Sequence, residues 1–367
     1  MKKVLILTTS TGQGHNQAAS SLIDAFSKEG FECIKLDFLA SNSKILNKTV
    51  VKGYEILASK FPSIYGWFYD FTDSEKTNTL LQIVFTFTTK KLLKSINLIK
   101  PDLIIGTHPL TVNLLAKLKK KNKISIPFIS IVTDFKAHFT YVNKLVDLYI
   151  TGSEYTKKSL IDRGISYDKI VTLGIPIKSD FYTNDKKVIE IKDKEYFNLL
   201  LMSGSMGLNN IYFVLNELLN NKHKLRITVV CGNNKALKEQ IINKCSQKYP
   251  NKKIHILGFT NDVSMLMDYS DAIISKPGGL TATESIVKNL PLIIPFSIPG
   301  QEMENTKFLC ENGYAICINN VKDINSTLDF LIENPNKLKE MKKNMNNLSS
   351  TYSTKKIVSI SSNLINV

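Results

Sequence analysis

The sequence predicts an α/β protein built from two Rossmann-like domains, and two observations support this prediction. Short apolar runs alternate with helical patterns along both halves of the chain, as parallel strands joined by crossover helices do. The 367 residues also exceed what one ordinary core accommodates. The expected strands are 3–8, 32–39, 102–107, 127–133 and 147–152 in the first half, and 198–204, 226–232, 253–259, 271–279, 291–296 and 314–318 in the second.

A polar segment at 183–195 separates the two series of strands and marks a linker. We predict an N-terminal domain over residues 1–177 and a C-terminal domain over residues 178–345. We expect residues 346–367 to form a helix that packs back toward the N-terminal domain. Two such domains facing each other across a cleft would bind ligands there, because open parallel sheets bind them at the carboxyl ends of their strands.

The composition is that of a soluble globular protein, with 43% apolar and 22% charged residues. Five scattered cysteines without a Cys-x-x-Cys spacing indicate a reducing compartment and argue against a disulfide framework or a zinc site. The apolar run at the N-terminus is too short for a signal peptide, and no run approaches the roughly 18 apolar residues of a membrane span. We therefore expect a cytoplasmic protein without an integral membrane anchor.

The net charge of +16 is concentrated in the first half of the chain and is almost entirely due to lysine. Arg163 and Arg226 are the two arginines of the sequence. Base-reading proteins favour arginine for its bidentate fork, so nucleic acid is not the expected partner. An anionic lipid surface suits a lysine-rich face better, although a general lysine bias of the host would also produce this charge.

Residues 41–100 interrupt the strand–helix rhythm. They contain the aromatic cluster "FPSIYGWFYDF" at 61–71 and the amphipathic stretch "LLQIVFTFTTKKLLKSI" at 80–96. Apolar faces flanked by lysines are typical of helices that lie in a membrane interface. Helices packed on the sheet, with their lysines reaching solvent, explain the same pattern equally well.

The segment "SKPGGLTATESIVKNLPLIIPFSIPGQEMEN" at 275–305 carries the strongest ligand signal. A strand ends at Ser275, and two glycines then let the backbone approach a ligand closely. The helix that opens at Leu280 directs its N–H groups and dipole toward an anion such as a diphosphate. Thr281 and Glu284 follow one turn into this helix, where a carboxylate can accept two hydrogen bonds from a ribose diol.

Two further turns follow strands of the second half. "SGSMG" at 203–207 lies between a strand and a helix, and its glycines free N–H groups for a second anion contact. "GFTND" at 258–262 follows another strand, and Phe259 there could hold a planar base.

The loop "TTSTGQGHNQAA" at 8–19 has the appearance of a phosphate cradle but differs from one in detail. A dinucleotide fingerprint requires glycine or alanine three residues after Gly14, where this chain has Gln17. We therefore interpret the glycines as holding His15 at the mouth of the cleft. His108, in "GTHPL", also follows a strand end and is either a lining residue or a satisfied loop histidine.

Five motifs occur in order over essentially the whole chain: "TTSTGQGHNQAA", "VTDFKAH", "GIPI", "SGSMG" and "KPGGLTATES" continued by "PGQEMEN". Together they resemble the diacylglycerol glycosyltransferases, the group of monogalactosyldiacylglycerol synthases and bacterial processive diacylglycerol glucosyltransferases. More distantly they resemble the enzyme that forms lipid II from UDP-N-acetylglucosamine. The resemblance implies a GT-B fold, a lipid-acceptor domain followed by a UDP-sugar domain, and inversion at the anomeric carbon.

The resemblance also implies roles for individual positions. On the acceptor side it indicates Gly14 and His138, with His15 and Asp134 at the reacting centre, and Tyr141 stands where the family commonly has tryptophan. His108 remains an acceptor-side candidate because of its place after a strand end. For the UDP-sugar it indicates Ser203, Gly204, Ser205, Gly207, Phe259, Lys276, Gly278, Gly279, Leu280, Thr281, Glu284, Gln301, Glu302 and Asn305.

An inverting transfer needs one general base and positive potential for the departing diphosphate. His15 and Asp134 are both candidates for the base; histidine is favoured by its usual pKa, and Asp134 could instead orient a histidine. Metal-dependent sugar transferases usually carry an Asp-x-Asp motif, which this sequence lacks, so we expect no metal and no other cofactor. The expected reaction moves a hexose from UDP-glucose or UDP-galactose to diacylglycerol, once or processively, on the cytoplasmic face of the membrane.

Two alternatives remain open at this level. The first is a transferase that uses UDP-N-acetylglucosamine on a lipid-linked cell-wall precursor. The second is a non-catalytic membrane sensor that binds a UDP-sugar. A candidate base kept at the cleft argues against a pure sensor.

Overall fold

The computed structural model describes residues 1–9, 13–38, 53, 61–75, 77, 86–184, 192–204, 210–247 and 249–365. The chain forms two compact units. The N-terminal unit contains Met1–Lys178, Ile298–Asn305 and Thr351–Val367, and the C-terminal unit contains Ser179–Ser297 and Thr306–Ser350. The sequence-based division places 298–305 in the second domain and starts the returning segment at 346, whereas in the structure 298–305 makes its contacts in the N-terminal unit.

The N-terminal unit is built on a parallel six-stranded sheet with the strand order β2-β1-β3-β4-β5-β6. Its strands are β1 (Lys3–Thr8), β2 (Glu32–Asp37), β3 (Leu103–Gly106), β4 (Phe128–Ile131), β5 (Leu148–Thr151) and β6 (Ile170–Thr172). β1 lies between β2 and β3, with Val4 opposite Cys33 on one side and Leu103 on the other. The predicted Rossmann-like pattern of the first half is therefore confirmed.

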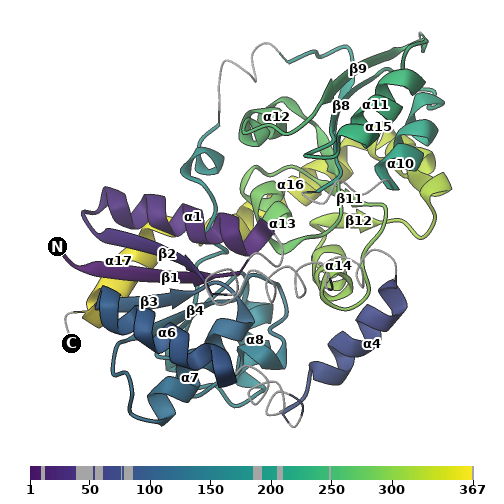
Figure 1. Cartoon of the computed structure of the whole chain (residues 1–367). Helices are drawn as coiled ribbons and strands as arrows, with labels where there is room; N and C mark the ends of the chain where they lie inside the picture. Colours follow the sequence, from purple (N-terminus) through teal and green to yellow (C-terminus); the bar gives the residue numbers. More distant parts are fainter. Residues whose placement is uncertain are drawn as a thin grey trace. The chain divides into compact units, whose positions relative to one another are not determined.

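Helices cover both faces of this sheet (Figure 1). α1 (Gln13–Lys28) and α17 (Thr354–Ile365) pack with the side chains of Val4 and Ile6. α6 (Thr86–Ile99) and α7 (Pro109–Lys120) pack on the other face, toward Leu5 and Leu7. Successive side chains of a strand point to opposite faces, so the apolar run of β1 supplies both cores.

Shorter elements complete this unit: α4 (Pro62–Thr72), α8 (Glu154–Ile161), and the 3-10 turns η1 (Phe139–Tyr141) and η2 (Tyr167–Lys169). α4 begins with Pro62, which favours a first helical position because its fixed φ suits the helix and it needs no N–H partner there. Within the part of the chain that the structure describes, no helix is long and apolar enough to span a membrane.

The C-terminal unit contains a second parallel six-stranded sheet, ordered β12-β11-β10-β7-β8-β9. Its strands are β7 (Phe197–Met202), β8 (Leu225–Val230), β9 (Lys252–Leu257), β10 (Ala272–Ile274), β11 (Leu292–Ile294) and β12 (Ala315–Cys317). Its helices are α10 (Asn210–Leu219), α11 (Lys235–Lys244), α12 (Val263–Tyr269), α13 (Gly279–Val287), α15 (Ile324–Glu333) and α16 (Pro335–Ser349), with η3 (Ser179–Tyr182) and η4 (Val321–Asp323). α14 (Gln301–Glu311) begins in the segment that belongs to the N-terminal unit.

Each sheet has one point where the strand order reverses direction. In the N-terminal unit it lies between β1 and β3, and in the C-terminal unit between β7 and β10. Ligands of doubly wound sheets bind at the carboxyl ends of the strands beside such a point. The segments that leave these four strands hold His15, His108, Ser203 and Lys276, so both candidate sites lie where the topology favours binding.

Candidate active site

His15 lies in the first turn of α1, directly after the loop that leaves β1. Its Nδ1 atom is 2.7 Å from the carbonyl oxygen of Thr107, which leaves the neighbouring strand β3. A carbonyl oxygen only accepts hydrogen bonds, so Nδ1 carries the ring proton and donates it. The Nε2 atom of the neutral ring therefore keeps its lone pair and can accept a proton from a substrate.

Burial lowers the pKa of His15 to about 4, and the hydrogen bond to the Thr107 carbonyl opposes this effect. The imidazole is consequently neutral at physiological pH. In this form it can act as a base, though a weaker one than an unperturbed histidine.

The His108 ring packs edge-on against His15, with ring centroids 4.5 Å apart. Its Nδ1 atom accepts a hydrogen bond of 3.2 Å from the Leu110 N–H and so caps the N-terminus of α7. Burial, followed by the neighbouring His15, lowers the pKa of His108 well below its usual value. One face of His15 is therefore covered by a second neutral imidazole that also orders α7.

Thr133 and Tyr141 extend the contacts of His15. The Thr133 hydroxyl lies 3.0 Å from His15 Nδ1 and 3.0 Å from the Tyr141 hydroxyl. Tyr141 is buried, and burial, followed by the charge of Asp134, raises its pKa. Sequence reasoning did not select Thr133, although its position directly before Asp134, in the loop that follows β4, was an available signal. It noted Tyr141 only as a departure from the family pattern.

Asp134 is buried, and its Oδ1 atom accepts a hydrogen bond from the side-chain amide of Gln301. The side-chain Nδ2 atom of Asn305 lies 3.5 Å from the same oxygen. The side-chain Oδ1 atom of Asn305 accepts a hydrogen bond of 2.9 Å from the Phe135 N–H. Sequence reasoning expected Gln301 and Asn305 near sugar hydroxyls. In the structure both amides, which lie in the first turns of α14, contact and orient the Asp134 carboxylate.

Two acidic residues hold the first turn of α14 in place. Glu302 Oε2 accepts a hydrogen bond of 3.0 Å from the Ile298 N–H, and Glu304 forms an ion pair of 2.6 Å with Lys136. Glu302, also expected near the sugar, thus closes the turn that precedes the helix. The Lys136–Glu304 pair ties this turn to the loop after β4, which carries Asp134.

His138 lies away from His15, against α4. Its Nδ1 atom accepts a hydrogen bond of 3.2 Å from the Thr140 N–H, and its Nε2 atom lies 3.0 Å from the Tyr69 carbonyl oxygen and donates to it. Burial lowers the pKa of His138, with the charge of Asp73 opposing. Both ring nitrogens are engaged within the protein, so the His138 ring has no lone pair left to act as a base.

In the C-terminal unit, the side chain of Lys276 lies close to both turns that the sequence predicts to bind phosphate. Gly204 follows β7 with φ +68°, and a Cβ atom placed there would lie 2.9 Å from Lys276 Cε. A Cβ atom at Gly278 would lie 3.8 Å from the Lys276 ammonium nitrogen. The lysine side chain therefore passes close to the Gly204 turn and its charge lies beside the Gly278 turn. Ser203 is buried, while Ser205 and Gly207 lie outside the described residues.

α13 begins at Gly279, and its N-cap residue, Gly278, supplies no side-chain cap. The N–H groups of the first turn, which includes Leu280 and Thr281, are thus not capped by that residue and face the region beside Lys276. Glu284 is buried one turn further along the same helix. The Ser275 hydroxyl, at the end of β10, is buried without a hydrogen-bond partner among the described residues.

Phe259 follows β9 and is 64% exposed. β9 lies three strands away from β10, which corresponds to roughly 14 Å at about 4.8 Å per strand. A ligand that reaches both Phe259 and the turn after β10 must therefore be elongated.

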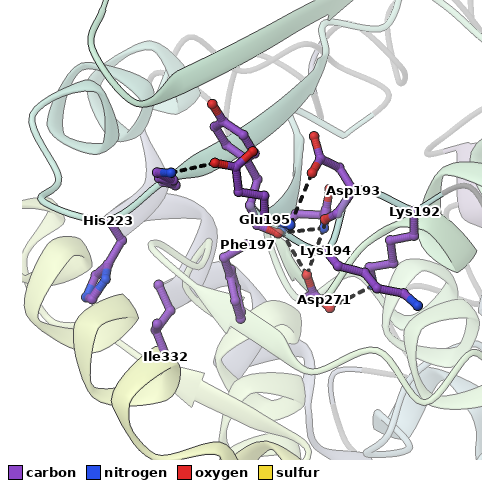
Figure 2. A pocket seen from close by; sticks show the side chains of 11 residues that line it. Lys192, Asp193, Lys194, Glu195, Phe197, His223, Asp271 and Ile332 are labelled. Carbon is purple, nitrogen blue, oxygen red and sulfur yellow. Dashed lines mark hydrogen bonds and ion pairs between the residues drawn. The ribbon is translucent and has the colours of Figure 1, made fainter.

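A hollow of about 670 Å³ lies elsewhere in the C-terminal unit, at the amino ends of β7, β8 and β10 (Figure 2). Several of its charged side chains pair with one another or with neighbours, as in Lys192–Asp271 at 2.7 Å and Lys253–Asp193 at 2.7 Å. It contains none of the predicted site residues and lies at the end of the strands opposite to Lys276. Among the residues that the structure describes, no three His, Cys, Asp or Glu side chains cluster as ligands of a metal ion.

Two family models match successive parts of this chain. A family model described as monogalactosyldiacylglycerol (MGDG) synthase matches residues 15–177, and the glycosyltransferase family 28 C-terminal domain matches residues 198–359. A processive diacylglycerol beta-glucosyltransferase of Bacillus pumilus is 33% identical, with 97% of this chain and 94% of the relative covered. The Bacillus subtilis protein of the same name is 30% identical with the same coverage.

The fold also matches solved structures. MurG of Acinetobacter baumannii is 14% identical, with a TM-score of 0.65, 99% of this chain and all of that chain covered. A UDP co-structure of S. aureus MnaA is 16% identical, with a TM-score of 0.64 and 100% and 98% coverage. The two Rossmann-like units and these likenesses define the GT-B fold, and the family matches define the class of the protein as a glycosyltransferase. Within this class the chain belongs to the family of the processive diacylglycerol beta-glucosyltransferases, as its ordered motifs predict.

Proposed function

We propose that this protein transfers a hexose from UDP-glucose or UDP-galactose to the free hydroxyl of 1,2-diacylglycerol, with inversion at the anomeric carbon. The observation that carries the proposal is the nearly full-length similarity to relatives named processive diacylglycerol beta-glucosyltransferase. The N-terminal unit supplies the base and binds the acceptor, and the C-terminal unit holds the UDP part of the donor.

The reaction is a single in-line displacement. The acceptor oxygen forms a bond to the anomeric carbon of the hexose, while the bond from that carbon to the diphosphate oxygen breaks and UDP leaves. The acceptor proton passes to a base of the protein. Because the oxygen loses electron density to the new bond, its proton becomes far more acidic as the bond forms, so a weak base is sufficient.

We assign the base to His15. Its Nδ1 proton is held by the Thr107 carbonyl, which leaves the Nε2 lone pair for the substrate. Asp134 is the second candidate, although one of its oxygens accepts hydrogen bonds from Gln301. In the proposed mechanism Asp134 receives a hydrogen bond from the acceptor or stabilises the positive charge that develops on His15.

The departing diphosphate is assigned to Lys276 and the first turn of α13, with Gly204 and Gly278 allowing close approach. Ser203 supports the first of these turns.

Thr281 contacts a phosphate oxygen, Glu284 accepts from the ribose hydroxyls, and exposed Phe259 covers the uracil ring. Gln301, Glu302 and Asn305 are assigned to the sugar hydroxyls, as the family motif implies. No metal ion is assigned a role, since a lysine and a helix N-terminus can supply the positive potential.

We assign membrane contact to α4. Phe61, Ile64, Trp67, Phe68 and Phe71 are each about half exposed or more, and Trp67 stacks on Phe71 at 5.3 Å. The spacing of residues 64, 67, 68 and 71 places them on one helical face. Diacylglycerol remains in the bilayer because of its chains, so an acceptor-binding unit must reach a lipid surface. The net charge of +16 favours an anionic one, on the cytoplasmic face.

The test is a transfer assay with purified protein, vesicles of diacylglycerol and anionic phospholipid, and each UDP-sugar in turn. We expect mass spectrometry to show hexosyl-diacylglycerol with UDP-glucose or UDP-galactose, in EDTA as in its absence. Failure of both hexose donors would overturn the proposal. Transfer of N-acetylglucosamine alone to a lipid-linked cell-wall acceptor would support the other enzymatic hypothesis. Loss of activity in EDTA that magnesium restores would overturn the metal-free mechanism.

A further inference from the structure

Helix α4 has two faces of different character. Its outer face carries the exposed residues Ile64, Trp67, Phe68 and Phe71. Its inner face carries Gly66 and Thr72, which are buried, and Tyr69, which is partly buried. The inner face packs on the segment that leads into α14, within the N-terminal unit.

Two close approaches fix this packing. A Cβ atom at Gly66 would lie 2.6 Å from Pro299 Cβ. The backbone of α4 at Gly66 therefore packs directly against Pro299, with no room for a side chain between them. Gly300 has φ +88°, and a Cβ atom there would lie 2.8 Å from Tyr69 Cγ. The Tyr69 ring therefore lies on Gly300, the residue directly before Gln301, whose amide binds Asp134.

The C-terminal end of α4 is anchored as well. Asp73 forms a bidentate ion pair with Arg163 and accepts a hydrogen bond of 2.8 Å from the Phe139 N–H. The Tyr69 ring also packs against His138, with centroids 4.5 Å apart. Tyr69 is thus held between Gly300 and His138 by contacts that do not involve its hydroxyl.

The hydroxyl of Tyr69 is a hydrogen-bond donor for which the described part of the chain supplies no acceptor. Burial, followed by the charge of Asp134, raises its pKa well above the usual value, so it stays protonated. It forms no hydrogen bond with any residue that the structure describes. A protonated phenol beside a carboxylate site, on a helix with an apolar outer face, suits an acceptor that arrives from lipid and carries oxygen atoms that only accept.

We propose that Tyr69 is an acceptor-binding residue whose hydroxyl donates a hydrogen bond to an ester carbonyl of diacylglycerol, while its ring fixes the Gly300–Gln301 turn beside Asp134. The inference rests on the proposed function. Diacylglycerol has one free hydroxyl, which reacts, and two ester carbonyls, which accept hydrogen bonds. A contact to an ester would orient the free hydroxyl toward the base without competing for its proton.

The test compares wild type with Tyr69→Phe, which removes the hydroxyl and keeps the ring on Gly300. We expect kcat/KM for diacylglycerol to fall by roughly 3- to 10-fold, the usual effect of losing one neutral hydrogen bond. KM for the UDP-sugar and the Tm should not change. Tyr167→Phe is the matched control, because Tyr167 is exposed in the same unit and belongs to no proposed site.

A dialkylglycerol acceptor, which has ether links in place of esters, isolates the proposed contact. Wild type should prefer diacylglycerol to dialkylglycerol by about the same factor, and Tyr69→Phe should lose this preference. An unchanged kcat/KM in Tyr69→Phe, or an equal ester preference in both proteins, would overturn the inference. A fall in Tm together with poorer kinetics for both substrates would assign Tyr69 a structural role instead. An inactive wild type would count against the proposed function itself.

Discussion

The Nδ1 atom of His15 lies 2.7 Å from the carbonyl oxygen of Thr107, and this contact determines the tautomer of the candidate base. The two residues follow β1 and β3, the neighbouring strands at which the sheet order reverses. The imidazole therefore presents the unprotonated Nε2 atom, which the proposed displacement requires.

Replacing His15 with alanine should lower kcat by about 10²- to 10⁴-fold, since a positioned general base contributes roughly that much. KM for the UDP-sugar should change little, because the donor is assigned to the C-terminal unit. Initial rates of glycolipid formation measure both quantities. His255→Ala, an exposed change on β9, is the control. A His15→Ala enzyme with more than a tenth of wild-type kcat would exclude His15 as the base.

The hydrogen bond between Asp134 and Gln301 can be tested separately. Gln301→Ala should lower kcat by about 10-fold, because the carboxylate loses its close donor, while Asp134→Asn should cost about 10²-fold or more. The kcat values of Gln301→Ala and Asp134→Asn are compared with that of His15→Ala under the same conditions. If Asp134→Asn were the most damaging of the three and His15→Ala mild, the base would have to be reassigned to Asp134.

The lowered pKa of His15 predicts how stability depends on pH. An unfolded histidine binds its proton near pH 6.5, whereas folded His15 does so only near pH 4. The unfolded state therefore binds more protons between these values. The free energy of unfolding should be unaffected by this group above about pH 7 and should decrease as the pH falls from 6.5 to 4, by roughly 3 kcal/mol in total.

Denaturant unfolding at several pH values measures this dependence, with His15→Gln as the matched variant that cannot titrate. The variant should lose stability less steeply than wild type over the same interval. Identical slopes for the two proteins would contradict the assigned pKa. His108 and His138, whose pKa values are also lowered, remain in both proteins and contribute equally.

Lys276 and Gly204 test the assignment of the diphosphate. Lys276→Ala should weaken UDP binding by about 10-fold or more, since it removes the positive charge beside the Gly278 turn. Gly204→Ala should also weaken it, because the new methyl group would meet Lys276 and the φ of +68° disfavours alanine. Calorimetric titration with UDP measures both effects. Lys235→Ala, an exposed lysine of α11, should bind as wild type does; equal affinity in all variants would refute the assignment.

The outer face of α4 tests the membrane contact. Changing Trp67 and Phe71 together to serine removes two stacked, exposed rings and should reduce sedimentation with anionic vesicles several-fold. UDP affinity should remain unchanged, because no residue of the C-terminal unit is altered. Undiminished vesicle binding by the double variant would show that α4 does not carry the contact.

Several features of this protein could be predicted from the sequence because they depend on local patterns. Apolar runs that alternate with helical periods specify two parallel sheets, and the structure confirms both. The ordered motifs indicate the family, which the relatives confirm. His15 follows β1, at the strand-order reversal of the first sheet, and its place at the mouth of a cleft and its chemical role stay predictions.

The contacts within the candidate site could not be predicted in this way. Thr107 and Thr133 lie about a hundred residues from His15 in the sequence, and no pattern marks a threonine as the partner of a histidine. Gln301 and Asn305 were predicted to bind a sugar because a family motif contains them. Their place on Asp134 depends on a chain that returns to the N-terminal unit at 298–305.

The sequence by itself determined the elements, their order and the residue types available for transfer chemistry, because periodicity and short motifs act over a few residues. The tertiary structure alone decided which of those residues meet. It determined the tautomer of His15, the partners of Asp134 and the position of Tyr69 on Gly300. The physical reason is that hydrogen bonds and close packing act over 3 to 4 Å in space, between residues whose separation along the chain has no characteristic value.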